Sequence, residues 1–217
     1  TPGPAYRLAS FSIDYRRPES PGLIKNPGRL DIAVGEPARA EPIAAAPPRL
    51  LRLLGEAGYP LAKLEDRSAV VDHAAQEMRV ALKIDEGPRA VFGEIRVTGL
   101  DRVEAAYVIR VAALPPGEVF DVAKIDEARR RLFATDLFEA LQIEKADTPD
   151  AEGRLDIVIK VQERERRTVS LGLNFSTTDG FGGDVEWRHR NFFGEDEDLI
   201  LNFRLAELEQ SARAELA

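Results

Sequence analysis

Apolar residues follow two different periods along the first 165 positions of the chain. Short stretches alternate apolar and polar residues, as half-buried strands do, whereas longer stretches place apolar residues three or four positions apart, as amphipathic helices do. Strands are predicted at 6–14, 59–72, 77–85, 91–97, 138–145 and 154–162, and helices at 48–58, 103–113 and 121–135. Because strands and helices are mixed along the chain, the pattern predicts an α+β fold.

Proline, glycine and aspartate residues set the expected ends of the helices. Pro48 fits the first turn of a helix, and Gly58 fits the position just after one. The segment 16–35 is rich in proline and glycine, so it is predicted to be mostly loop, with at most one helical turn around 23–34. Asp121 is placed to cap the last helix, whose inward residues are predicted to be Val122, Ile125, Ala128, Leu132 and Phe133.

The two halves of this region resemble each other in sequence. Gly35-Glu36-Pro37 corresponds to Gly117-Glu118-Val119 at an offset of 82 residues, and the strand segment 80–84 corresponds to 157–161 at an offset of 77. A drifting offset is what two diverged copies produce when their loops gain and lose residues. We therefore predict two repeats, 1–87 and 88–165, each built as strand, helix, helix, strand, strand.

The pattern changes after Arg166 and shows strand periodicity alone. Alternating stretches at 168–176, 184–188, 199–205 and 212–216 are separated by turns. Strands of about ten residues with one apolar and one polar face form the walls of membrane β-barrels, in which closure satisfies every backbone group. The same periodicity is also typical of an antiparallel sheet in a soluble protein, so the pattern alone leaves both structures open.

Composition narrows the classes of function. The chain has 30 Lys and Arg against 38 Asp and Glu, and its net charge of −8 argues against nucleic acid as a partner. It has no cysteine, so disulfides and thiolate metal sites are excluded. Its two histidines, His73 and His189, lie in no nucleophile or zinc motif and are expected to be solvated or interfacial. The basic run 129–131 is expected on the solvent-exposed face of a helix. We expect no enzyme activity, no cofactor and no metal.

One motif and one junction resemble a known family. Trp187-Arg-His-Arg-Asn-Phe-Phe-Gly194 follows directly on an alternating stretch, and the segment 80–95 joins the two repeats. Together with the repeats, these features resemble the superfamily of bacterial outer-membrane assembly factors that includes BamA, TamA and two-partner secretion transporters. The spacing is most similar to TamA, with BamA as the near alternative. The motif hairpin comprises Trp187, Arg188, Asn191, Phe192, Phe193 and Gly194, and it departs from the family in its acidic turn at 195–198.

The resemblance implies two tandem POTRA domains, followed at 166–217 by the first antiparallel strands of a truncated transmembrane β-barrel. It implies a non-enzymatic factor that assembles and inserts other proteins at the bacterial outer membrane, with its POTRA domains in the periplasm. The implied partners are unfolded outer-membrane or autotransporter proteins, a periplasm-spanning TamB-like protein or Bam-type lipoproteins, and outer-membrane lipid. A signal peptide and at least one further POTRA domain would precede the chain, and most of a sixteen-stranded barrel would follow it. The alternatives are a two-partner secretion transporter and a soluble periplasmic scaffold.

Exposed sheet edges are the candidate binding sites, because an open edge pairs with an incoming strand through backbone hydrogen bonds. The resemblance places these edges at the second strand of each repeat, 61–66 and 139–145, and the seam of the barrel at 168–176. Charged residues along both edge strands leave open a second interpretation, in which charge and solvent merely protect the edges. The candidate residues are Leu61, Lys63, Leu64, Glu65, Glu139, Leu141, Ile143 and Lys145 at the edges, and Val169, Leu171, Leu173 and Phe175 at the seam.

Overall fold

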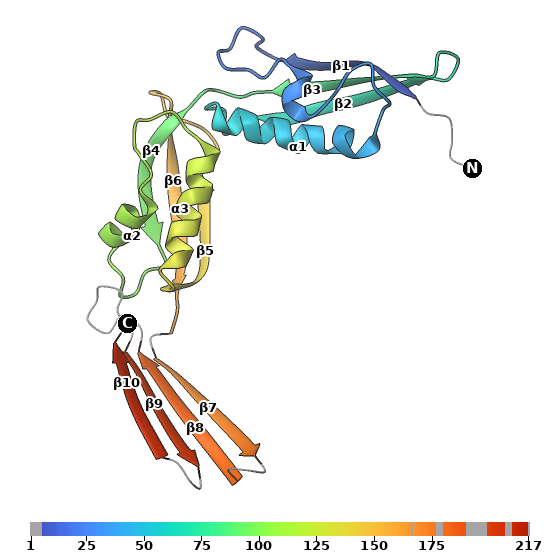
Figure 1. The fold of residues 1–217 in the computed structure, drawn as a ribbon. Helices are drawn as coiled ribbons and strands as arrows, with labels where there is room; N and C mark the ends of the chain where they lie inside the picture. The colour runs from blue at the N-terminus through green and yellow to red at the C-terminus, as the bar shows by residue number, and fades with distance from the viewer. Residues whose placement is uncertain (1–5, 166, 177–179, 190–198, 207–209, 217) are drawn as a thin grey trace. The chain divides into compact units, whose positions relative to one another are not determined.

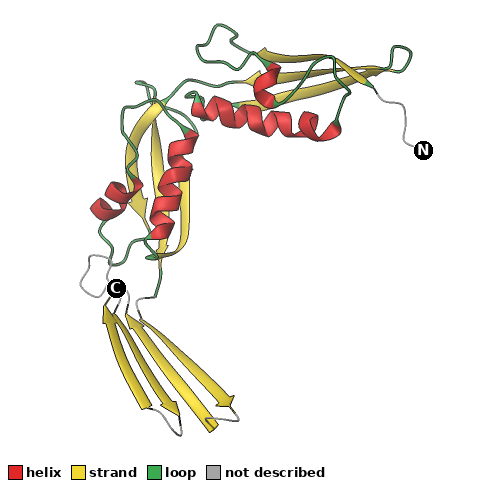
Figure 2. Cartoon of the chain, viewed as in Figure 1, coloured by secondary structure: helices red, strands yellow, loops and turns green. Residues whose placement is uncertain are grey.

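The computed structural model describes residues 6–165, 167–176, 180–189, 199–206 and 210–216 (Figure 1). The chain divides into two compact units. One consists of residues 1–95, 114–126 and 145–158, and the other of residues 96–113, 127–144 and 159–217. Both units contain helices and strands, so the predicted α+β class is confirmed (Figure 2).

The first repeat combines a three-stranded sheet with one long helix. β1 (Arg7–Tyr15) runs parallel to β3 (Glu77–Asp85), and β2 (Lys63–Asp72) runs antiparallel to β3, which gives the order β1-β3-β2. Between β1 and β2 lie a short 3-10 helix, η1 (Pro27–Leu30), and the helix α1 (Ala40–Glu56). η1 falls inside the segment where the sequence predicts at most one helical turn, whereas β2 begins later than its pattern predicts.

The start of α1 differs from the sequence prediction. The helix begins at Ala40 instead of Pro48, and both Pro47 and Pro48 lie inside it. A proline inside a helix removes a backbone donor, which opposes this arrangement. Packing favours the longer helix nonetheless, because Ile43 in the added turns is buried on the same face as Leu50, and the alanine-rich segment before Pro47 has high helix propensity. The predicted start at Pro48 is therefore wrong.

α1 ends in a Schellman motif at the predicted glycine. Gly58 has a φ of +97°, and the N–H of Tyr59 donates to the carbonyl of Leu54 over 2.9 Å. The phenol of Tyr59 donates to the carbonyl of Pro21 over 2.6 Å. This bond fastens the loop after β1 to the end of the helix, and the predicted helix end at Gly58 is confirmed.

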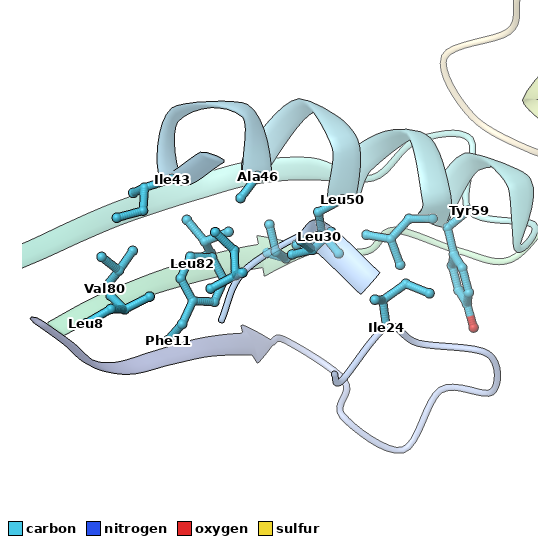
Figure 3. Packing of buried hydrophobic residues seen from close by; sticks show 13 residues of the cluster. Leu8, Phe11, Ile24, Leu30, Ile43, Ala46, Leu50, Tyr59, Val80 and Leu82 are labelled. Atoms are coloured by element: carbon cyan, nitrogen blue, oxygen red, sulfur yellow. The ribbon is translucent and has the colours of Figure 1, made fainter. Parts of the chain in front are cut away.

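The core of the first repeat lies between α1 and the sheet (Figure 3). Ile43 and Leu50 point from α1 toward Leu82 on β3, whose side chain is fully buried. Leu8 and Phe11 on β1 face the same core, although three positions separate them in the sequence. A regular strand would turn two residues at this spacing to opposite faces of the sheet.

A β-bulge at Ala9 explains why Leu8 and Phe11 share a face. Leu8 pairs with Met78 on β3, and Ser10 pairs with the next residue, Arg79, so Ala9 has no partner across the pair. One extra residue shifts the alternation by one position. The bulge thereby keeps the apolar side chains on both sides of it in the core.

The second repeat has the predicted order strand, helix, helix, strand, strand. β4 (Val91–Thr98), β6 (Arg154–Glu163) and β5 (Phe138–Lys145) form a sheet in the order β4-β6-β5. The helices α2 (Ala105–Ala112) and α3 (Val122–Ala134) lie between β4 and β5 in the chain. The carboxylate before α3 acts as the predicted cap, because Oδ1 of Asp121 accepts a hydrogen bond of 2.8 Å from the N–H of Ala123.

Two side chains on α3 lie elsewhere than the sequence predicts. Ile125 and Leu132 are buried as predicted, but Phe133 is 46% exposed. The buried stripe follows steps of three and four residues, and residue 133 falls outside it. Arg131 does not extend into solvent as predicted, because its Nε donates to the carbonyl of Val111 at the end of α2 over 3.0 Å. The prediction that Phe133 turns inward is wrong.

The remaining four strands form an open antiparallel sheet in the order β10-β9-β8-β7, as far as the structure describes the chain. The strands are β7 (Arg167–Ser176), β8 (Gly180–His189), β9 (Leu199–Ala206) and β10 (Gln210–Leu216). The register places large exposed apolar residues on one face of the sheet, and these are Val169, Leu171, Leu173, Phe175, Phe181, Val185, Phe203, Leu205 and Leu216. An apolar face of this size on exposed strands is typical of a barrel wall that faces lipid.

Candidate strand-docking edges

A short extended segment covers the outer edge of β1 in the first repeat. The N–H of Gly35 donates to the carbonyl of Leu8 over 2.8 Å, and the N–H of Leu8 donates to the carbonyl of Glu36 over 2.9 Å. The N–H of Ala38 donates to the carbonyl of Tyr6 over 2.7 Å. The backbone groups on this edge are therefore already paired.

The second repeat covers the outer edge of β4 in the same way. The N–H of Gly117 donates to the carbonyl of Phe92 over 2.7 Å, and the N–H of Phe92 donates to the carbonyl of Glu118 over 2.8 Å. The N–H of Phe120 donates to the carbonyl of Ala90 over 3.0 Å. These are the same three bonds as in the first repeat, made by the segments that the sequence comparison aligns. In both sheets this leaves the second strand of the repeat, β2 or β5, at the uncovered end.

The first half of β2, where the sequence analysis places the binding edge, contains charged side chains and a bulge. Leu61 precedes the strand, and Nζ of Lys63 lies 3.6 Å from the carboxylate of Asp85. Leu64 pairs with β3 just before a second bulge at Glu65, whose carboxylate forms an ion pair of 2.7 Å with Arg16. This half of β2 is held by contacts within the repeat.

The other half of β2 offers a better edge, which the sequence analysis missed. Ser68, Ala69, Val70 and Val71 carry no charge, and the exposed fraction of Val70 is 62%. Uncharged β-branched residues on an uncovered edge favour pairing with another strand. The signal was present in the sequence as an uncharged run within an otherwise charged strand.

The predicted residues of β5 lie along the uncovered edge of the second sheet. Leu141 and Ile143 are half-buried, and Glu139 is exposed, with its carboxylate 3.4 Å from Nε2 of Gln162 on β6. All three side chains lie on β5, so the structure places them close together along the edge of the sheet. The edge of β5 thus presents apolar side chains beside an acidic one.

Lys145 at the end of β5 makes a contact that the sequence does not predict. Its side chain as a whole is exposed, yet its ammonium group donates to the carbonyl of Pro60. Burial of the ammonium group lowers the pKa of Lys145 below its ordinary value. The surroundings of the ammonium group, rather than the exposure of the whole side chain, determine this pKa. Nearby, Arg52 forms an ion pair of 3.3 Å with Asp126.

The predicted seam strand lies at one end of the last sheet. β7 pairs with β8 on one side, and no other described strand pairs with it. Val169, Leu171, Leu173 and Phe175 share one face, and Leu173 is 94% exposed. The strand therefore combines an uncovered backbone edge with an apolar face.

Part of the predicted motif hairpin can be placed. Trp187 and Arg188 lie on β8, whereas Asn191, Phe192, Phe193 and Gly194 lie outside the described residues. His189, expected to be solvated or interfacial, is 9% exposed and stacks on the indole of Trp187 with ring centroids 5.7 Å apart, so it is not solvated.

The other candidates for chemistry lie on the surface. His73 is exposed, as expected, and its Nδ1 shares a hydrogen bond of 2.7 Å with the hydroxyl of Tyr6. No group of three potential metal ligands occurs among the described residues. Within the same residues, no helix is both long and apolar enough to cross a membrane.

Residues 90–164 match the family model of the POTRA domain, described as a surface antigen variable number repeat. This range contains the second repeat from β4 to β6. The second repeat is therefore a POTRA domain, as the resemblance implies.

Two outer membrane protein assembly factors named BamA are similar to the chain in sequence. The protein of Neorickettsia risticii (strain Illinois) is 24% identical over 115 residues, which are 53% of this chain and 15% of that protein. The protein of Nitratidesulfovibrio vulgaris is 26% identical over 139 residues, which are 63% of this chain and 17% of that protein. The chain thus spans about a sixth of the length of these curated relatives.

Two solved structures share the fold. BamA from Haemophilus ducreyi lacking POTRA domains 1–3 aligns with a TM-score of 0.72 at 19% identity, over 93% of this chain and 37% of that chain. POTRA domains 3–5 of Haemophilus influenzae BamA align with a TM-score of 0.58 at 21% identity, over 73% of this chain and 61% of that chain. The first alignment extends over nearly the whole chain, so the likeness in fold is not confined to the two repeats.

Proposed function

Because this chain belongs to the BamA/Omp85 superfamily, we propose that it forms part of a factor that assembles outer-membrane proteins without enzymatic chemistry. Its location is the bacterial outer membrane, with the POTRA domains in the periplasm. In the proposed mechanism, strand pairing and the burial of apolar surface in lipid supply the driving force. No step of this mechanism requires a nucleotide or a metal.

The uncovered edges of β2 and β5 are the observation that carries the proposal. Each repeat pairs the outer edge of its first strand with its own chain, through the same three hydrogen bonds. An arriving strand is then directed to the opposite end of each sheet. Backbone pairing selects weakly for sequence, so these edges suit clients of many different sequences.

β7 supplies a third uncovered edge, and it lies in the sheet whose exposed face is apolar. A client strand paired with β7 would satisfy its backbone groups along that side. Its own apolar face would continue the apolar face of the sheet. We therefore propose that β7 acts at the seam where clients enter the membrane.

The proposed clients are unfolded outer-membrane or autotransporter proteins. The proposed partners are a periplasm-spanning TamB-like protein or Bam-type lipoproteins, together with outer-membrane lipid. The choice of TamA within the superfamily rests on the spacing of sequence motifs, and it stays a prediction.

A photo-crosslinking amino acid placed at Val70 or Leu141 of the full-length polypeptide tests the edges. Val34 supplies a matched control, because it is 50% exposed and precedes the segment that covers β1, while Val70 is 62% exposed on the uncovered edge. We expect adducts with newly made outer-membrane proteins from Val70 and Leu141, and few from Val34. Equal yields from Val34 and Val70, or no adducts from either edge, would contradict the proposed role.

A further inference from the structure

A carboxylate of β8 reaches across to the edge strand β7. Gly172 on β7 is directly opposite Asp184 on β8. A Cβ atom added at Gly172 would lie 2.5 Å from each carboxylate oxygen of Asp184 and 2.7 Å from its Cγ. The carboxylate therefore fills the space that a side chain on β7 would need, which is possible because residue 172 is glycine.

The Asp184 carboxylate has no hydrogen bond and no ion pair in the described part of the chain. Its cross-strand neighbour on β9 is Arg204, but the two side chains form no ion pair. Glu186, two positions further along the same face of β8, instead lies 3.6 Å from Nη2 of Arg188. The negative charge of Asp184 is therefore available to a group that arrives at the edge of the sheet.

A strand added along β7 would bring one residue to this charge. Directly opposite residues in an antiparallel pair project from the same face, with their Cβ atoms about 4.5–5.5 Å apart. The residue opposite Gly172 would therefore meet the Asp184 carboxylate in place of a β7 side chain. Residues opposite Thr168 and Ser170 would meet the side chains of β7 itself.

We propose that Asp184 selects the client residue that pairs with Gly172, favouring Lys or Arg and disfavouring Asp or Glu. The inference rests on the proposed role of β7 as the seam strand, and it adds one point of sequence selectivity to backbone pairing. Opposite charges stabilise a cross-strand pair, and like charges destabilise it.

A disulfide assay isolates this position, because residues 1–217 contain no cysteine and any cysteine elsewhere in the full-length polypeptide is first replaced by serine. The full-length polypeptide with Ser170→Cys, in lipid vesicles, is equilibrated in glutathione buffer with short peptides of alternating valine and threonine. Each peptide carries one cysteine, with Lys, Ser or Glu two residues before it. In antiparallel pairing the disulfide at residue 170 sets this variable residue opposite Gly172. Peptides with the variable residue two positions after the cysteine control for register.

With Asp184 present, we expect the Lys peptide to form about two- to fivefold more disulfide than the Glu peptide. Asp184→Asn should bring this ratio to about one, and Gly172→Ala should lower it, because the added Cβ displaces the carboxylate. Glu186→Gln is the matched control and should leave the ratio unchanged.

Two outcomes would overturn the inference in different ways. A Lys-to-Glu ratio of about one with Asp184 present, or a ratio that Asp184→Asn leaves unchanged, removes the role of Asp184 while the seam stands. No disulfide with any peptide removes the seam function of β7, and the inference with it.

Discussion

Glu163, the last residue of β6, fastens the loop after β4. Its Oε1 accepts hydrogen bonds from the backbone N–H groups of Asp101, Arg102 and Val103 over 2.9, 3.0 and 2.9 Å. Burial alone raises the pKa of Glu163, but these hydrogen bonds to the charged form outweigh it, so the pKa lies below its ordinary value. The ionised carboxylate therefore stabilises the folded state more than the protonated form does.

Replacing Glu163 should reduce the stability of the second repeat in a pH-dependent way. We expect Glu163→Ala to lower the free energy of unfolding by roughly 1.5–3 kcal/mol at neutral pH, because three donors lose a charged acceptor. A lowered pKa in the folded state means that this contribution is present above the unfolded pKa of about 4.3 and is lost as the pH falls through the folded pKa. Urea unfolding at neutral and acid pH measures it.

The exposed Glu139 on β5 supplies the control for this comparison. Glu139→Ala should change the free energy of unfolding by less than about 0.5 kcal/mol at either pH. A loss in Glu163→Ala that stays the same from neutral to acid pH would show that the charge of the carboxylate is not what stabilises the loop.

At the scale of the element, we predict that client strands pair with the uncharged half of β2, residues 68–71. Lysine on an edge strand opposes pairing with another strand. We expect Val70→Lys to lower client adducts from a crosslinker at Ser68 by about two- to fivefold, the range of a cross-strand pair. Val34→Lys, next to the covered edge, should leave the yield unchanged. Equal yields in all three chains would mean that clients do not pair with β2.

Most elements could be predicted from the sequence, because each has a local cause. Alternation marks β3, and the cap at Asp121 and the glycine at Gly58 mark the ends of helices. The early start of α1 could not be predicted, because it depends on the packing of Ile43 against a sheet formed by distant residues. The bulge at Ala9 likewise depends on pairing with β3.

The candidate edges could be predicted only in part. The correspondence between 35–37 and 117–119 was visible in the sequence, but the two segments cover β1 and β4 through hydrogen bonds to residues distant in sequence. The position of Asp184 over Gly172 depends on the register of β7 with β8, which alternation does not fix. Contacts set by register or by distant pairing are thus the ones that sequence patterns leave undetermined.

At the scale of the whole molecule, an uncovered edge strand recurs in three different sheets. β2, β5 and β7 each lie at an end of a sheet with an edge that no other described strand covers. β5 belongs to the POTRA domain, β2 belongs to the repeat that precedes it, and β7 belongs to the sheet with the apolar face. A chain that repeats an uncovered edge in this way suits the handling of many strands better than the recognition of one partner.

The most direct test of this account is the abundance of outer-membrane β-barrel proteins after depletion of the full-length polypeptide. Quantitative proteomics of the outer-membrane fraction supplies the measurement. We expect many unrelated β-barrel proteins to fall together, because edge pairing selects weakly for sequence. If the barrel proteins keep their levels and a single secreted protein disappears, the chain belongs to a secretion transporter, and its role as an assembly factor is contradicted.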